Sequence, residues 1–295
     1  MTDAPPDTAR SRALIVLLLG ACVIGVGPVL VRLAEVGPAA AGFWRLVFAL
    51  PLLAALARHN SDGVGRPNRL VLLAGIAFAL DLGFWHYGIA YTSVAKATVL
   101  SNLTPVFVTA AAWIFLRQRP QRMFLVAVAL ALAGAWIMAL AKGSGSLGKS
   151  PALGDALSAI TAIWYALYFM TVSAARTTQG ATRIMFWSTL TGAPILLLAA
   201  LGLQEQLLPN SIVGWGACMG LGLMHVAGQG SIAWALGRLP AAVASVVVLI
   251  QPVVAGVLGW LLFNELFGPW QAVGAAIALG GVVLAQWSAR AKPQS

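Results

Sequence analysis

Eight polar or ionisable side chains that could carry chemistry interrupt long apolar runs of this sequence. They are Arg45, Asp81, His86, Lys96, Asn102, His225, Gln229 and Gln251. Such groups are costly at the depth of a membrane unless they face protein or water, so each one indicates a functional site. The chemistry that this set supports is the binding of charged and polar groups, with proton loading open to a buried carboxylate such as Asp81.

Arg45 and Asp81 fall at similar depth on neighbouring apolar runs, so their charges could meet. The pair could be purely structural, each charge compensating the other. Alternatively, Asp81 takes up and releases a proton as part of the function, or binds an amine. The sequence leaves both roles open. Lys96 lies about one turn from the end of its run and can extend to the membrane surface.

Two amides accompany two prolines. Asn102 lies three residues before Pro105, and Gln251 directly precedes Pro252. A proline inside a helix frees a backbone carbonyl one turn earlier, and a freed carbonyl beside an amide could hold an ammonium or carboxylate group. The alternative is a kink that only shapes packing.

Aromatic side chains at helical spacing predict one wall of a cavity. The candidates for this wall are Trp85, Trp164, Tyr165 and Tyr168. Aromatic walls suit partly apolar substrates and can hold a cation over a ring. Tryptophans near the ends of apolar runs are more often interfacial anchors. We interpret Trp136, Trp270 and Trp287 in that way.

Glycines gather in the apolar run that contains His225. Gly228 and Gly230 could act as a hinge when the protein changes shape. Their other role is to let helices approach closely. Cys22 and Cys218 each lie in an apolar run and suggest neither a disulfide nor a metal site.

The composition indicates a membrane protein: of the 295 residues 60% are hydrophobic and 9% charged. A span needs roughly 20 apolar residues. We predict ten transmembrane helices, over residues 13–31, 38–57, 70–91, 94–116, 123–141, 152–173, 184–203, 212–237, 241–263 and 269–287.

The basic residues favour one side of the membrane. The net charge of +10 comes from Lys and Arg in short breaks between apolar runs, which argues for orientation in a bilayer and not for nucleic-acid binding. Most of them fall on the side that holds both ends of the chain. Both termini are therefore predicted to be cytoplasmic.

Two halves of the chain resemble each other. Pro105, Trp113 and Gly134 recur 147 residues later, and Phe43-Trp44 and Pro51 recur 143 residues later. Five spans in each unit would place the second upside down relative to the first. The expected division is a tail 1–12, a first repeat 13–141, a linker 142–151, a second repeat 152–288 and a tail 289–295.

The repeated pattern resembles a known family. T-S-x-A-x-A-x-x-L-x-x-L-x-P-V-F from Thr92, followed by a closing A-L-A-G-A-W, is similar to the EamA repeat of the drug/metabolite transporter superfamily. The resemblance implies ten helices in two inverted five-helix repeats, in a bacterial-type cytoplasmic membrane, with a substrate site between the halves. The aromatic central helices look most like the YddG amino acid exporters.

We therefore expect a secondary transporter that exports amino acids, aromatic and other neutral ones first, or similar small metabolites by alternating access. Export of drugs, cations or another metabolite class is the near alternative. An intramembrane enzyme or a scaffold is the alternative of a different class. The histidines fit no H-E-x-x-H pattern, and no G-x-S-x-G or Walker-type loop occurs. We expect no cofactor and no metal, with lipid and a small molecule as partners, and a monomer, with a dimer left open.

Overall fold

The structure is a computed structural model that describes residues 7–59, 63–92, 100–140, 150–263 and 268–290. Within these ranges all regular secondary structure is helical. The first part of the chain forms α1 (Asp7–Ile24), α2 (Gly27–Leu33), α3 (Pro38–His59), α4 (Arg69–Tyr91), α6 (Thr104–Leu116) and α7 (Arg122–Leu140).

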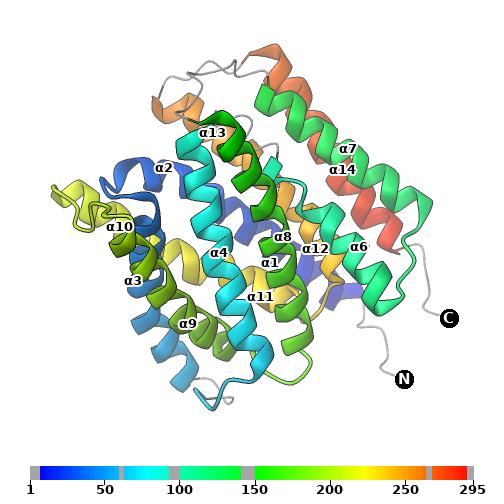
Figure 1. Ribbon diagram of the computed structural model, residues 1–295. Coiled ribbons are helices and arrows are strands. Elements are labelled where there is room, and N and C mark those ends of the chain that lie inside the picture. The colour runs from blue at the N-terminus through cyan, green and yellow to red at the C-terminus, as the bar shows by residue number, and fades with distance from the viewer. Residues whose placement is uncertain (1–6, 60–62, 93–99, 141–149, 264–267, 291–295) are drawn as a thin grey trace.

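The second part of the chain is also helical throughout its described elements (Figure 1). It forms α8 (Pro151–Ala175), α9 (Ala181–Gly202), α10 (Ile212–Met224), a π-helical turn η1 (His225–Gln229), α11 (Gly230–Ala235), α12 (Ala241–Val247), a short 3-10 turn η2 (Val248–Ile250), α13 (Gln251–Phe263) and α14 (Pro269–Arg290).

Seven of the described helical segments are long and apolar enough to cross a membrane, and α6 and α7 are shorter apolar helices. This confirms the prediction of an all-helical membrane protein. The count of ten stays a prediction. The predicted span over 94–116 appears as α6 from Thr104 onward, while residues 93–99, which include Lys96, lie outside the described residues.

Prolines divide three of the predicted spans. Pro28, Pro105 and Pro252 each occupy the first turn of a helix, because that turn needs no donor from the proline nitrogen. The first predicted span is therefore two helices, α1 and α2, joined at Gly25–Val26. The ninth passes from α12 through η2 into α13. The predicted kinks at Pro105 and Pro252 thus coincide with new helix starts.

Antiparallel helix pairs connect the two parts of the chain. Along α3 and α9, Gly42 faces Leu196 while Leu46 faces Gly192, so the numbers rise in one helix as they fall in the other. Along α4 and α8, the ring of Phe78 lies 4.9 Å from that of Tyr168, and Gly88 faces Ser158. Both pairs therefore run in opposite directions.

The third pair, α7 and α14, lies side by side in Figure 1 and packs backbone against backbone. Gly134 faces Ala278, and Gly281 faces Ala131. Gly281 and Ala278 lie 147 residues after Gly134 and Ala131. The contact is therefore the same when the two helices are exchanged. Small residues permit this approach, as they do in membrane helix packing generally.

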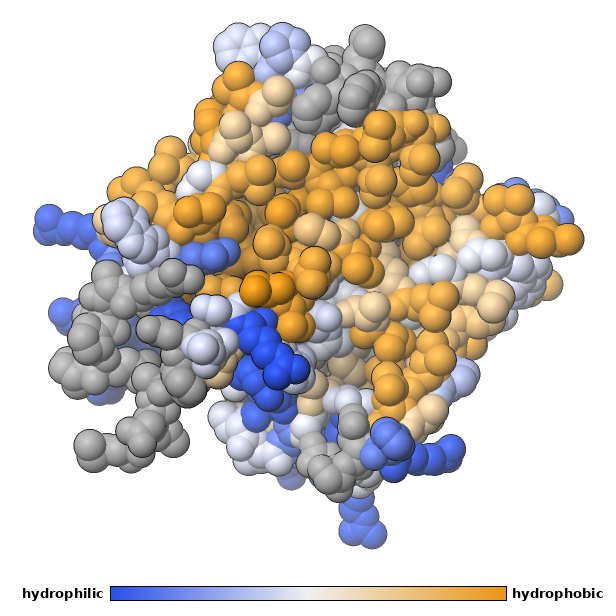
Figure 2. All heavy atoms as spheres, turned by 180° about the vertical axis from the view of Figure 1, so that it is seen from behind, coloured by the Kyte–Doolittle hydropathy of each residue, from blue (hydrophilic) through white to orange (hydrophobic). Residues whose placement is uncertain are grey.

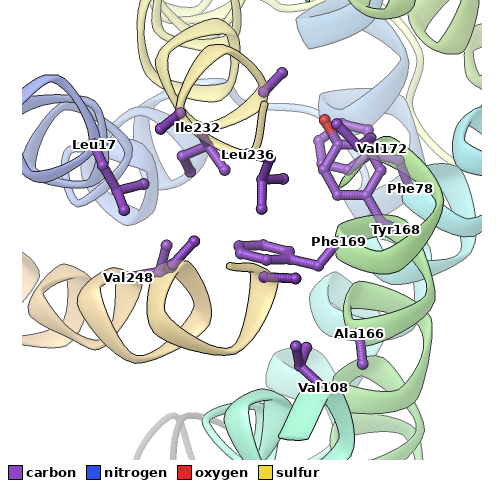
Figure 3. Packing of buried hydrophobic residues seen from close by; sticks show 14 of the residues in the cluster. Leu17, Phe78, Val108, Ala166, Tyr168, Phe169, Val172, Ile232, Leu236 and Val248 are labelled. Atoms are coloured by element: carbon purple, nitrogen blue, oxygen red, sulfur yellow. The ribbon is translucent and has the colours of Figure 1, made fainter. Parts of the chain in front are cut away.

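The core lies where helices of both parts meet. Figure 3 shows side chains from α1, α4, α6, α8, α11 and η2 converging, among them Leu17, Phe78, Phe169 and Val248. In Figure 2 hydrophobic residues cover most of the middle of the visible face. Trp136, Trp270 and Trp287 are exposed, as interfacial anchors require, and their anchoring role stays a prediction.

Neighbouring glycines of α14 test the close packing. A Cβ at Gly281 would come within 2.7 Å of the Ala131 Cα atom, whereas one at Gly280 would meet open space. We expect Gly281→Ala to cost about 1–3 kcal/mol through overpacking and to lower the thermal unfolding midpoint in detergent. Gly280→Ala, the control, should be neutral or stabilising by up to about 1 kcal/mol. Equal midpoints in the two variants would contradict the packing.

Candidate functional site

A cavity of about 150 Å³ lies between helices of both parts of the chain. Many of the residues singled out in the sequence line it: Arg45, Asp81, Trp85, Asn102, Pro105, Tyr165, Gln229, Gln251 and Pro252. They come from α3, α4, the start of α6, α8, η1 and α13. The fold thus brings together groups that are up to two hundred residues apart in the sequence.

The two proline segments face the cavity as an equivalent pair. Ser101, Thr104 and Pro105 line it, and so do Val248, Gln251 and Pro252, which lie 147 residues further on. At both places the chain leaves α-helical geometry just before the proline. The two repeats therefore contribute the same kind of surface, a helix start that carries polar side chains.

Arg45 and Asp81 bring opposite charges to the cavity. They are 5% and 7% exposed, and their charges attract each other. Nevertheless, no hydrogen bond or ion pair within 4 Å joins them in the described structure, and the guanidinium carbon of Arg45 lies 5.4 Å from the centre of the Phe78 ring. Two buried charges without a direct partner are expensive unless water or a ligand supplies one.

The amide side chains add free hydrogen-bond donors. Buried nitrogen atoms of Arg45, Asn102 and Gln251 have no hydrogen-bond partner among the described residues. Gln229, which is fully buried, lies beside the hydroxyl groups of Tyr165 and Tyr168. The cavity therefore offers one cation, one carboxylate and several donors to a ligand that carries charges of both signs.

Four of the predicted site residues lie outside the cavity lining: His86, Trp164, Tyr168 and His225. His86 Nδ1 lies 2.7 Å from the carbonyl oxygen of Pro38 and therefore donates to it. His225 Nε2 is 2.9 Å from the Thr189 hydroxyl oxygen. These contacts connect helices and give the histidines a structural role.

The two aromatics of this group pack against neighbours of the cavity wall. The Tyr168 hydroxyl donates to the sulfur of Met185 at 3.6 Å, and its ring stacks on that of Tyr165. The Trp164 ring lies 6.4 Å from that of Phe84. Both therefore support the wall from behind.

The sequence reasoning missed several lining residues. Phe78 lies one helical turn before Asp81, and Thr161 one turn before Tyr165, so helical spacing from a known site residue could have found them. Gly25, Gly27 and Pro28 line the cavity where α1 gives way to α2. The signal there was the Gly-Val-Gly-Pro run, which breaks an otherwise apolar span.

No group of three or more His, Cys, Asp and Glu side chains that could hold a metal occurs in the part of the chain that the structure describes. Cys22 and Cys218 are free thiols. The groups that line the cavity are two opposite charges, amides and aromatic rings, and such groups suit reversible binding.

Apolar helices around a small, mostly apolar cavity with two opposite charges in its lining are the architecture of a helical membrane transport protein. Residues 11–140 and 152–287 both match the sequence model of the EamA-like transporter family. The two matches cover most of the chain, which therefore belongs to the EamA-like transporter family. This membership indicates a transporter and not an enzyme.

Relatives of this chain carry transporter names. An uncharacterized transporter of Archaeoglobus fulgidus is 27% identical over 91% of this chain and 94% of its own. The pseudopaline exporter CntI of Pseudomonas aeruginosa is 25% identical over 76% of this chain and 77% of its own length. A protein of known crystal structure, 16% identical, covers 94% of this chain and 99% of its own with a TM-score of 0.81, which shows the shared fold.

The glycines that the sequence suggested as a hinge sit in different surroundings. A Cβ at Gly228 would lie 3.0 Å from the Gly20 carbonyl oxygen and closer still to Ile24, whereas one at Gly230 would meet open space. Gly228 therefore serves the packing of η1 against α1. Gly230 directly follows the π-helical turn, a feature that often marks functional sites.

We expect Gly228→Ala to lower the thermal unfolding midpoint in detergent, at a cost of about 1–3 kcal/mol. Gly230→Ala is the matched control and should keep the midpoint. If both variants were as stable as the wild type, and both transported substrate more slowly than the wild type, the hinge role would hold and the packing role would be excluded.

Proposed function

We propose that this protein is a secondary transporter that exports amino acids, or similar small molecules with both a cationic and an anionic group, by alternating access. The observation that carries the proposal is the pair of buried charges, Arg45 and Asp81, which line one cavity without a direct bond between them. A carboxylate facing Arg45 and an ammonium group facing Asp81 would satisfy both.

The aromatic wall extends the proposal to amino acids with apolar or aromatic side chains. Trp85, Phe78 and Tyr165 give one part of the cavity apolar surface, while the charges and amides gather around it. The amino and carboxylate groups of an amino acid would face the charges and amides, and its apolar side chain would face the aromatic wall. This supports our assignment to amino acid exporters of the YddG type.

Ten helices in two inverted repeats are the architecture that we propose for this transport. The antiparallel pairs α3 with α9 and α7 with α14, and the exchangeable contacts of Gly134 and Gly281, support it. The basic residues support cytoplasmic termini in a cytoplasmic membrane. We propose a monomer as the working unit, because one chain encloses the cavity.

Export of another small metabolite is the second candidate. The Pseudomonas aeruginosa relative is named as an exporter of pseudopaline. A molecule other than a standard amino acid is therefore a second candidate for the transported substrate, and the same assay can test it. The donors of Arg45, Asn102 and Gln251 would suit any such compound that is rich in carboxylate oxygens.

The charged pair can be tested in proteoliposomes with a panel of radiolabelled amino acids, with membrane potential and pH gradient set separately. Each charge-assisted hydrogen bond contributes about 1.5–3 kcal/mol, so Arg45→Gln and Asp81→Asn should each raise KM about ten- to hundredfold. Asp155→Asn is the control, because Asp155 bonds to Thr92 and lies outside the cavity lining.

The same assay separates the two roles of Asp81. If it also couples transport to protons, Asp81→Asn should lose the response to a pH gradient but keep the response to membrane potential. Unchanged KM in both cavity variants would exclude the charged pair as the substrate site. Wild-type protein that moves pseudopaline but no amino acid would establish the second candidate.

A further inference from the structure

Two tryptophans make equivalent hydrogen bonds at equivalent places in the two parts of the chain. Trp44 Nε1 donates to the carbonyl oxygen of Leu207 at 2.7 Å, and Trp187 Nε1 donates to that of Val64 at 2.9 Å. Both the donors and the acceptors are 143 residues apart. Each tryptophan thus holds a loop of the other repeat.

The two bonds lie at opposite ends of the molecule. Trp44 is near the start of α3 and its acceptor follows the end of α9, whereas Trp187 is near the start of α9 and its acceptor follows the end of α3. The two helices pack antiparallel, and each has 22 residues, or about 33 Å at 1.5 Å per residue. The bonds therefore mark the two ends of one helix pair.

Each bond also restrains a helix that carries cavity residues. The loop with Val64 leads into α4, which carries Asp81 and Trp85, and the loop with Leu207 leads into α10 and η1, which ends at Gln229. Release of one loop would free one of these helices to move away from the α3 and α9 pair. The other end would stay closed.

The contact around Trp44 is the more extensive of the two. Glu205 accepts hydrogen bonds from the backbone N–H groups of Ala39, at 3.2 Å, and Ala40, at 2.9 Å, and its carboxylate thereby caps α3. It also accepts a hydrogen bond from the Tyr87 hydroxyl of α4. This end therefore fastens the α9–α10 loop to two helices of the first repeat.

The contact around Trp187 depends on neutral backbone acceptors. Trp187 Nε1 also lies 3.2 Å from the carbonyl oxygen of Gly65, and Arg183 Nε donates to that of Gly63 at 3.3 Å. Gly65 has φ +45° and lies against the Arg183 guanidinium. Among the described residues no carboxylate contributes to this end, and Asp62, which lies 143 residues before Glu205, is outside them.

We propose that the Trp44 and Trp187 contacts are two equivalent latches, each closing the cavity at one end, and that transport breaks them in turn. The inference rests on the proposed alternating access. It names the residues that hold each end closed, with Glu205 as part of the Trp44 latch.

The latches can be tested by labelling a cysteine in the cavity from either side of the membrane. Ala255 lines the cavity and is partly exposed, so Ala255→Cys in a chain with Cys22→Ser and Cys218→Ser is a suitable reporter. A membrane-impermeant maleimide is added to right-side-out or inside-out vesicles. The labelling rates from the two faces report the two openings.

Replacing either tryptophan with phenylalanine keeps the ring and removes only the hydrogen bond. Loss of one such bond should raise labelling from one face about fivefold. Trp44→Phe and Trp187→Phe should act on opposite faces, and Glu205→Gln should act on the same face as Trp44→Phe. Cooperative thermal unfolding shows that a variant is folded. If the Trp44→Phe variant does not unfold cooperatively, Glu205→Gln takes its place in the comparison.

Labelling that rises from the same face in both tryptophan variants, or from neither, would overturn the latches. Opposite shifts support them, even in a protein that moves no amino acid, in which case only the proposed substrate fails. Conversely, amino acid transport with identical labelling in all variants would leave the proposed function intact and reject the latches alone.

Discussion

Lipid offers no hydrogen bonds, so every polar group in these apolar helices has to find its partner inside the protein. Some of them do. His86 bonds to the Pro38 carbonyl and His225 to Thr189. Arg45 and Asp81 are the contrast, because both are buried, both line the cavity and no hydrogen bond joins them. This unsatisfied pair is the basis of the binding site that we propose.

Close helix packing keeps that cavity in place. Glycine and alanine let α7 and α14 touch along their backbones, and Gly42 and Gly192 make room for leucine side chains between α3 and α9. Regular helices, α3, α4 and α8, supply part of the cavity lining. Other lining segments, η1, η2 and the turn between α1 and α2, depart from regular α-helix.

The two parts of the chain use the same contact. The Trp44 and Trp187 bonds are equivalent, and Glu205 adds charge-assisted bonds at the Trp44 end. In the transport cycle that we propose, this duplicated structure supplies two similar openings, one at each end of the α3 and α9 pair.

The membrane class, the helical fold and the charged and amide side chains of the cavity lining could be predicted from the sequence, because polar side chains in apolar runs have few other places to go. The roles of His86, Trp164, Tyr168 and His225 could not, because helical spacing does not say which way a helix is turned. Phe78 was missed because an apolar residue in an apolar run carries no signal of its own.

The sequence by itself determined which segments form apolar helices and where prolines begin new ones, since hydropathy and proline act locally. Only the tertiary structure decided which polar groups pair with each other and which face the cavity. That choice depends on contacts between segments far apart in the chain, such as Trp44 with Leu207. No local pattern encodes such a contact.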